Sequence, residues 1–305
     1  MTRILHEPVM VNQVVSYLLA HRREVIVDCT AGDGGHSEAV LQETNSTFVI
    51  AIDIDSEAVA VAKERLQRRY PGRVLVMKGD YRELQKTLAV LGVPRVDGIL
   101  LDLGVSSRQV DVPQRGFTYW GRAPLDMRMD RDSQVTARDI LMTYSEGELR
   151  RIIREYGEER FAARIARGIV QRRDADQLET AEDLVEVVKK AIPVQYRQND
   201  IHPARKTFQA LRIATNDEIS RLRASIERFF SHLRPGGALV VLSYHSLEDR
   251  IVKTVFKQLE ESGDGRRLTR KPEVPSEAEV RANPRARSAK LRALEKVHRV
   301  RRGPK

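Results

Sequence analysis

The amino-acid sequence predicts an α/β protein with a mostly parallel, doubly wound sheet that carries an inserted all-helical subdomain. Two observations predict the sheet. Short apolar runs alternate with helix-like stretches through the first hundred of the 305 residues, and the alternation returns after about residue 208. A third observation predicts the insert, because the intervening segment has mainly helical periodicity.

Four apolar runs in the first part are continuous rather than alternating, which is typical of strands covered on both faces by crossover helices. These expected strands lie at residues 25–28, 48–53, 74–77 and 96–103. Helices are expected between them, including 37–42 and 56–69. Ser56 is the expected N-cap of the second of these helices.

The alternation of strand-like and helix-like segments ends after Leu103. Residues 104–132 are rich in Gly, Pro, Asp and Arg without a clear period, which predicts a long functional loop. Residues 136 to about 191 then show helical spacing of apolar side chains and form the expected insert.

The sheet pattern returns after the insert. A helix is expected over about 208–233, and Pro235-Gly236-Gly237 then turns the chain into a strand at 238–243. Residues 263–283 are expected to be a mobile loop, and 285–300 to hold a closing strand and a tail.

The most informative motif is a glycine-rich turn after the first expected strand. It reads Asp28-Cys-Thr-Ala-Gly-Asp-Gly-Gly-His-Ser37, and Asp53 follows Gly32 by 21 residues. Glycine lets the backbone approach a nucleotide-like ligand, and an acid at this spacing suits a ribose diol. Because Ser37 replaces the third glycine of a dinucleotide fingerprint, the pattern favours S-adenosylmethionine over a nicotinamide cofactor. An ordinary strand-to-helix turn is the alternative.

Composition limits the class of protein. The chain is 41% hydrophobic and 31% charged, and no apolar run approaches the ~20 residues of a membrane span, so no membrane partner is expected. The N-terminal residues lack a signal-peptide core, which predicts a cytoplasmic protein. Cys29, the single cysteine, ends a buried strand, which disfavours methylation at pyrimidine C5 through a cysteine adduct. No Cys/His cluster has metal-ligand spacing, so no metal is expected.

Positive charge is concentrated near the C-terminus. The net charge is +10, and residues 266–305 hold 14 Lys and Arg against 4 Asp and Glu, so the remaining chain is neutral overall. Such a segment predicts contact with a phosphate backbone. A solvated basic terminus is the alternative.

Four aspartates end or follow expected parallel strands: Asp28, Asp53, Asp80 and Asp102. The carboxyl ends of such strands share one edge of the sheet, where α/β proteins bind ligands. Asp102 is the candidate catalytic residue. A carboxylate that accepts the hydrogens of an exocyclic base amine helps that nitrogen attack a methyl group and lose a proton. A backbone carbonyl is the alternative proton acceptor.

Aromatic and histidine residues supply further candidates. Tyr81 follows the third strand and is placed to flank an adenine, while His36 is expected to contact the cofactor or cap the turn. Residues 243–250 contain Ser, His and Asp but lack a nucleophile elbow, so they are interpreted as a turn lining the site. Three residues of the expected loop are candidates for stacking on the base, with loop packing as the alternative for each: Phe117, Tyr119 and Trp120.

Nine short sequence blocks along the chain carry a resemblance to a known family. They are His6-x-Pro8-Val9, residues 28–37, Asp102-Leu-Gly-Val-Ser-Ser-x-Gln109, Arg115-Gly-Phe117, Pro124-Leu-Asp-Met-Arg-Met-Asp130, Tyr156-Gly-Glu-Glu-Arg160, Thr207-Phe-Gln-Ala-Leu-Arg212, residues 243–253 and Asn283-Pro-Arg-Ala-Arg-Ser-Ala-Lys290. Together they resemble the bacterial methyltransferase family that modifies N4 of a cytosine in 16S ribosomal RNA. The resemblance runs from about His6 to Lys296.

The resemblance implies a Rossmann-like class I methyltransferase core at residues 1–108 and 212–305. It also implies an inserted loop and helical substrate-recognition domain at 109–211, with S-adenosylmethionine as methyl donor. Tyr81 stands where phenylalanine is usual, a change that keeps an aromatic face. The implied cofactor contacts are Gly34, Gly35, His36, Asp53, Tyr81, Asp102 and Gln109.

The sequence therefore predicts methyl transfer to the exocyclic N4 of one cytidine in 16S ribosomal RNA, within the small ribosomal subunit. Amino methylation of DNA, at N4 of cytosine or N6 of adenine, is the enzymatic alternative because the chemistry of Asp102 does not distinguish the sugars. A nucleic-acid-binding regulator with a vestigial cofactor pocket is the non-enzymatic alternative.

Overall fold

The computed structural model describes residues 8–21, 23–197 and 202–297. The chain divides into two compact units. The first joins Met1–Gly104 to Ile219–Lys305, and the second is Val105–Glu218. The corresponding boundaries expected from the sequence are 108/109 and 211/212.

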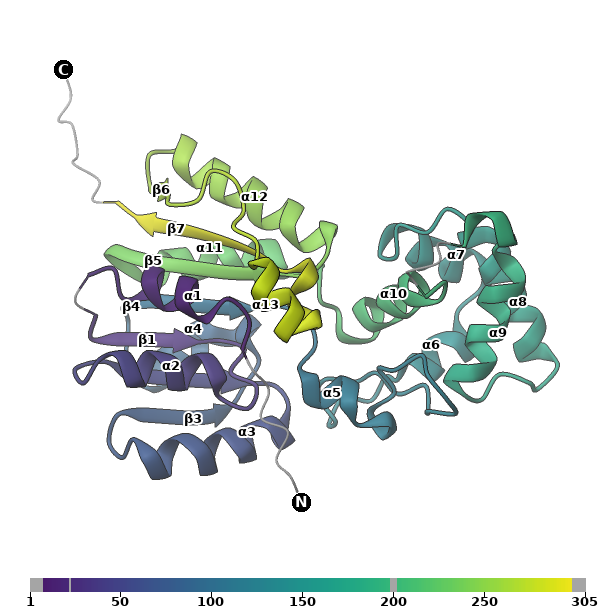
Figure 1. The fold of residues 1–305 in the computed structure, drawn as a ribbon, viewed down its shortest axis with the longest axis horizontal. Helices are drawn as coiled ribbons and strands as arrows, with labels where there is room; N and C mark the ends of the chain where they lie inside the picture. Colours follow the sequence, from purple (N-terminus) through teal and green to yellow (C-terminus); the bar gives the residue numbers. More distant parts are fainter. Residues whose placement is uncertain (1–7, 22, 198–201, 298–305) are drawn as a thin grey trace. The chain divides into compact units, whose positions relative to one another are not determined.

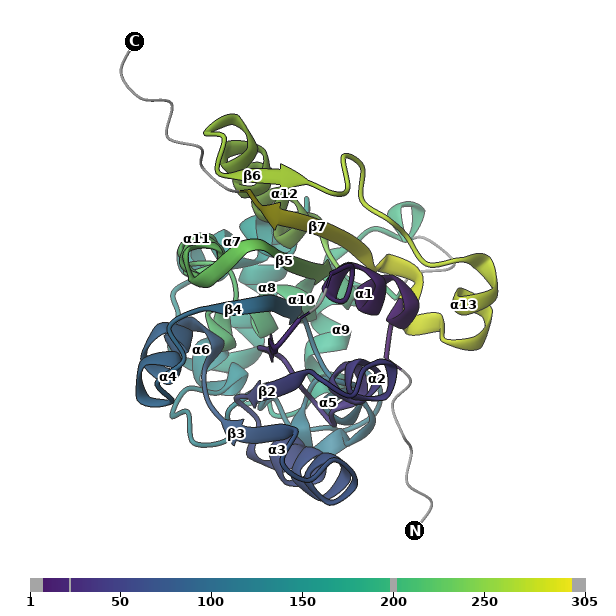
Figure 2. The ribbon, with the colours of Figure 1, turned by 90° about the vertical axis from the view of Figure 1, so that its left-hand side faces the viewer.

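The first unit is built on a seven-stranded sheet with the order β3-β2-β1-β4-β5-β7-β6, which Figure 2 shows from β3 at the bottom to β6 at the top. β1 to β5 are parallel, and β7 runs antiparallel to β5 and β6. The strands are β1 (Val25–Asp28), β2 (Phe48–Asp53), β3 (Val74–Lys78), β4 (Val96–Asp102), β5 (Leu233–Ser243), β6 (Gly265–Arg267) and β7 (Lys290–Lys296). This confirms the mostly parallel sheet and all six strands that the sequence predicts, including the closing strand within 285–300, which is β7.

Helices cover both faces of this sheet (Figure 1). Alternate residues of a strand enter opposite cores: Val49 and Ala51 of β2 join one apolar cluster, and Ile50 and Ile52 join the other. Burial on both faces explains why the strands are continuous apolar runs. The first cluster includes α1 (Val11–Leu18), α2 (Gly35–Glu43) and α3 (Ser56–Ala62), and the second includes α4 (Leu84–Val90), α11 (Leu222–His232) and α12 (Ser246–Glu261).

Several local expectations are wrong. The helix expected over 208–233 is two helices, α10 (Arg205–Asn216) and α11, because Asp217 adopts φ +51° and ends α10. Aspartate tolerates this left-handed conformation, so apolar periodicity does not register the break. The N-cap of α3 is Asp55 rather than Ser56, and the Asp55 side chain accepts from the Glu57 N–H.

Two segments expected to be loops contain regular structure. The stretch 263–283 holds strand β6, which pairs with β7, and the short helix α13 (Glu277–Ala282). The stretch 104–132 holds α5 (Ser107–Asp111), whose capping box joins Ser106 and Gln109. Both short helices are stabilised by local caps, a signal weaker than periodicity in a single sequence.

The predicted basic segment is partly folded into the sheet region. Arg292 pairs with Asp249 at 2.7 Å, Arg267 with Glu260 at 2.6 Å, and Arg266 with Glu295 at 3.1 Å. These cations therefore stabilise the fold instead of forming a free tail. The expected tail beyond Val297 lies outside the described residues.

The second unit is helical where the sequence predicts its insert. Its helices pack on one apolar core, and capping boxes at Thr136, Ser145 and Thr180 start three of them. The helices are α6 (Ala137–Thr143), α7 (Glu146–Glu155), α8 (Ala162–Asp174), α9 (Ala181–Ala191) and α10. No helix within the described ranges is long and apolar enough to cross a bilayer.

Candidate active site

The glycine-rich turn joins β1 to α2 at the carboxyl edge of the sheet. Gly34 has φ +87°, a backbone conformation that favours glycine, and a Cβ there would lie 2.8 Å from Cδ1 of Leu66, so that side chain would have to shift. At Gly35 a Cβ would lie 3.0 Å from Cγ of Pro8. The turn is therefore closely packed against Leu66 and Pro8.

Asp53 lies beside this turn at the end of β2. Its Oδ2 accepts the N–H of Gly32 at 2.7 Å, and its Oδ1 accepts the N–H of Asp55 at 2.9 Å. An ionised carboxylate has about four acceptor sites, and these bonds use one on each oxygen. The fixed carboxylate can thus accept one further donor on each oxygen, as a vicinal diol requires.

Burial raises the pKa of Asp53 to about 6, against the lowering effect of its two backbone hydrogen bonds. The carboxylate is mostly ionised at neutral pH, yet it titrates close to the physiological range. A ligand that donates hydrogen bonds to Asp53 would favour its ionised form.

Asp28 and Cys29 lie deeper than Asp53. Asp28 is buried, its Oδ2 accepts from the Ser37 hydroxyl at 2.7 Å, and burial raises its pKa. Burial, and secondarily Asp28, raises the pKa of the Cys29 thiol well above its usual range. This is the opposite of a nucleophilic cysteine, in agreement with the expectation that Cys29 fills space.

Asp102 ends β4, accepts a hydrogen bond from one other segment and lies close to a second. Its Oδ1 accepts the hydroxyl of Tyr244 at 2.7 Å, and its Oδ2 lies 3.6 Å from Nδ1 of His36. Nε2 of His36 is 2.8 Å from the carbonyl oxygen of Val9. Since a carbonyl only accepts, Nε2 carries the hydrogen and Nδ1 faces the carboxylate.

Tyr244 lies in the stretch 243–250, which the sequence predicts to line the site but without a role for this side chain. Tyr244 follows β5, which neighbours β4. It therefore lies at the carboxyl edge of the sheet, the same edge at which the four aspartates are predicted. Burial, together with the Asp102 carboxylate, raises the pKa of Tyr244 well above its usual range. The hydroxyl therefore remains a donor to Asp102 at physiological pH.

Tyr81 starts a short 3-10 helix after β3. The Gly79 N–H donates to the Asp53 carbonyl at 2.9 Å, which ties this segment to the end of β2. Asp80 caps the 3-10 helix and pairs with Arg82 at 2.7 Å. Of the four aspartates at this edge, Asp80 thus has a local capping role.

Gln109 lies in the second unit and is buried in α5. Its Oε1 accepts from the Ser106 N–H at 3.1 Å, which completes the α5 capping box. The structure therefore brings together the glycine turn, His36, Asp53 and Asp102, whereas the Tyr81 ring packs edge-on against Phe229 of α11. Gln109 has a local role in its own unit.

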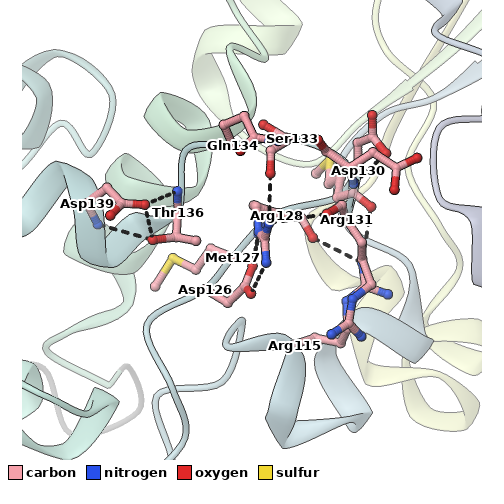
Figure 3. Close-up of polar contacts among 12 residues, drawn as sticks. Arg115, Asp126, Met127, Arg128, Asp130, Arg131, Ser133, Gln134, Thr136 and Asp139 are labelled. Carbon is pink, nitrogen blue, oxygen red and sulfur yellow. Dashed lines mark hydrogen bonds and ion pairs between the residues drawn. The ribbon is translucent and has the colours of Figure 1, made fainter.

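The chain after α5 is fixed by buried polar contacts (Figure 3). The Arg115 side chain is 2% exposed and donates to the carbonyls of Arg128 and Met129 at 3.0 and 3.1 Å. Arg128 in turn forms a two-pronged pair with Asp126, with both N···O distances 2.8 Å. Asn216 binds the same segment, since it donates to the Met127 carbonyl at 2.8 Å. This part of the expected long loop is consequently rigid.

Two glycines of this loop provide a matched stability test. Gly116 and Gly121 have φ of +77° and +70°, but a Cβ at Gly116 would lie 2.5 Å from the Pro124 carbonyl oxygen, whereas nothing lies within 4 Å at Gly121. Gly121→Ala should cost only the left-handed backbone, about 1 kcal/mol. Gly116→Ala should cost about 2 kcal/mol more because the backbone must shift. Urea unfolding measures the free energy of unfolding of both variants. Equal losses of stability would show that the loop shifts to accommodate the Cβ at position 116.

The comparison with known families decides the class of protein. A family model described as the MraW methylase family matches residues 3–297. The chain belongs to the MraW methylase family. The Rossmann-like fold predicted for a class I methyltransferase is the fold observed in the first unit.

Relatives of this methylase match along nearly their whole length. "Ribosomal RNA small subunit methyltransferase H" of Pseudothermotoga lettingae is 47% identical over 296 residues, which cover 96% of this chain and 99% of the relative. The protein of the same name from Thermotoga neapolitana is 48% identical over 295 residues, 96% of each chain. Among solved structures, an rRNA methylase from Streptococcus thermophilus aligns with 94% of each chain at TM-score 0.43 and 11% identity, a distant likeness.

For a methylase, the Tyr244–Asp102 contact makes a testable prediction. Tyr244→Phe removes only the hydroxyl and should lower kcat about tenfold, because a hydrogen bond to a charged group contributes about 1.5 kcal/mol or more. Tyr17→Phe is the matched control, since Tyr17 donates to Glu273 in the same unit. Steady-state kinetics should show an unchanged kcat in the control, and an unchanged kcat in Tyr244→Phe would contradict the positioning role.

Proposed function

We propose that this methylase transfers a methyl group from S-adenosylmethionine to the exocyclic N4 of one cytidine in 16S ribosomal RNA. It would do so in the cytoplasm, on the small ribosomal subunit. The observation that carries the reaction type is the Asp102 carboxylate, oriented by Tyr244 at the same sheet edge as the glycine turn and Asp53. The names of the relatives support ribosomal RNA of the small subunit as the substrate.

The residues present suit S-adenosylmethionine. Two backbone N–H groups fix the Asp53 carboxylate, with one hydrogen bond on each oxygen. Each oxygen can accept one further donor, which suits the two hydroxyls of a ribose. The turn at Gly34, Gly35 and His36 would face the amino acid part, and Tyr81 the adenine. Asp102 completes the six cofactor contacts proposed within the first unit. Gln109, the seventh position that the family resemblance implies, belongs to the second unit.

The role of Asp102 follows from the chemistry of the acceptor. The lone pair of an exocyclic base amine is delocalised into the ring, so the nitrogen is a weak nucleophile. Asp102 would accept a hydrogen bond from this amine, direct its lone pair toward the methyl carbon, and take the proton that the nitrogen loses. When bound, S-adenosylmethionine supplies the methyl group on a positively charged sulfur, and this activation requires no metal ion.

Methyl transfer to small subunits is the deciding experiment. Subunits that lack the modification should accept labelled methyl groups from S-adenosylmethionine, and nucleoside mass mapping should find N4-methylcytidine at a single 16S position. Duplex DNA and large subunits serve as parallel substrates. Transfer to DNA alone, or cofactor binding without transfer to any nucleic acid, would overturn the proposal.

A further inference from the structure

An exposed aromatic cluster lies at the tip of the loop that Arg115 anchors. The rings of Tyr119 and His202 are stacked, with centroids 4.5 Å apart and an interplanar angle of 7°. Trp120 contacts both rings, at centroid distances of 5.5 Å to Tyr119 and 4.9 Å to His202. The three rings, which we call the Trp120 platform, belong to the second unit.

The members of the platform differ in what holds them. Tyr119 packs against the helical core, with its ring edge-on to Phe208 at 5.8 Å, and Phe117 packs against the same core. Trp120 instead leaves 67% of its surface exposed. Of the three aromatic residues that the sequence suggests for base stacking, Trp120 is therefore the most exposed, while Phe117 and Tyr119 are partly buried.

Trp120 presents its indole from a segment whose two ends are held by polar contacts. Arg115 binds the chain at Arg128 and Asn216 binds it at Met127, so less conformational entropy is lost when a ligand covers the ring. Stacking on an aromatic ring contributes about 1–3 kcal/mol per base and tolerates any base. A preorganised, exposed tryptophan thus suits an unpaired nucleobase.

The charges near the platform favour the same ligand. Burial, and secondarily the Lys189 cation, lowers the pKa of His202, so the imidazole is neutral at physiological pH and presents a π face. Lys189 supplies a positive charge near this ring, and the exposed Arg122 follows Trp120 by two residues. The second unit as a whole has 20 Lys and Arg against 19 Asp and Glu, so its net charge is close to zero. A nearly neutral unit gains little from phosphate attraction, so stacking is the interaction by which this unit would bind RNA.

We propose that the Trp120 platform stacks an unpaired base of the RNA substrate. The inference rests on the proposed function, because it takes RNA as the substrate, and it adds the residue that holds a base. Trp120 is a binding residue here, since it performs no proton transfer. The expected consequence is a lower RNA affinity without Trp120, with cofactor affinity unchanged.

Intrinsic fluorescence tests the stacking directly, because Trp120 is the only tryptophan of the chain. The full-length protein, excited where tyrosine does not absorb, is titrated with a short single-stranded oligocytidylate RNA and with the same strand in a duplex. The single strand should quench the fluorescence and the duplex should not. No quenching at saturating RNA, or equal quenching by the duplex, would overturn the proposal.

Variants separate stacking from simple burial. Trp120→Leu keeps an apolar side chain without a π face and should weaken binding of the single strand about tenfold, whereas Trp120→Phe should weaken it less. Val135→Ala is the control, since Val135 is 48% exposed in the same unit and should leave the dissociation constant unchanged. Wild-type affinity in Trp120→Leu would overturn the proposal and indicate another partner for the platform, such as a protein.

The two proposals fail in different ways. Methyl transfer to small subunits by the wild-type protein, without quenching of Trp120, would refute the platform alone. Quenching by single-stranded RNA without methyl transfer would refute the proposed reaction and leave an RNA-binding surface. Each outcome is read from a separate assay on the same protein.

Discussion

Asp102→Asn should lower kcat by about 10²- to 10⁴-fold, which is the range for removal of a general base. The side-chain amide has nearly the shape of the carboxylate and still offers an oxygen to the Tyr244 hydroxyl. It cannot take a proton from the attacking nitrogen. Single-turnover methyl transfer to small subunits measures the effect, and calorimetry should show that the cofactor binds with far less change than kcat.

Asp80→Asn is the matched control for this substitution. Asp80 follows the neighbouring strand β3 at the same edge of the sheet, but its carboxylate caps a 3-10 helix and pairs with Arg82. The control should lose stability modestly and retain kcat within a few-fold. If Asp102→Asn keeps full activity, a backbone carbonyl or water takes the proton and the assigned role is wrong.

The sequence predicts the sheet well because the physical signal is strong and local. Strands buried on both faces must be apolar at nearly every position, and a short apolar run such as Phe48–Asp53 is typical of such a strand. The glycine turn and Asp53 are similarly local, since their spacing follows from one strand–helix–strand unit. These features require no knowledge of distant parts of the chain.

The position of Tyr244 at the site is predictable from the sequence, but its hydrogen bond to Asp102 is not. Tyr244 is 142 residues further along the chain, and it meets Asp102 because β4 and β5 are neighbours. The strand order follows from the long connection through the second unit, which apolar periodicity does not report. The requirement for glycine at position 116 is likewise set by the Pro124 carbonyl, a contact created by the folded loop.

Loss of the Asp53 carboxylate should weaken binding of S-adenosylmethionine by about 100-fold or more. The proposed ribose contact consists of two hydrogen bonds to a charged acceptor, each contributing about 1.5–3 kcal/mol. Asp53→Ala removes both bonds, and calorimetry at neutral pH measures the loss. Asp53→Asn retains one acceptor oxygen and should lie between Asp53→Ala and wild type.

The raised pKa of Asp53 adds a pH dependence with a definite sign. Hydroxyl donors bind the ionised carboxylate, whose pKa is about 6, so affinity should be constant above about pH 7 and fall as pH decreases through 6, approaching tenfold per unit. Titrations between about pH 5 and about pH 8 measure this slope. Asp28 also has a raised pKa, and a slope that persists in Asp53→Asn would assign the pH dependence to Asp28 instead.

Ionisation of Asp53 has opposite effects on cofactor binding and on the stability of the fold. A carboxyl whose pKa is about 6 in the folded state and about 3.9 in the unfolded state holds its proton more tightly when folded. Its effect on stability is therefore favourable at low pH and is lost as pH rises from about 4 to about 6, so at neutral pH the ionised group opposes folding. Asp53→Asn removes the ionised group, but its amide nitrogen cannot accept the second backbone N–H, so these two effects on stability oppose each other. The variant should therefore bind the cofactor more weakly with little change in its free energy of unfolding at neutral pH. A loss of stability without a loss of affinity would show that Asp53 serves the fold and not the ribose.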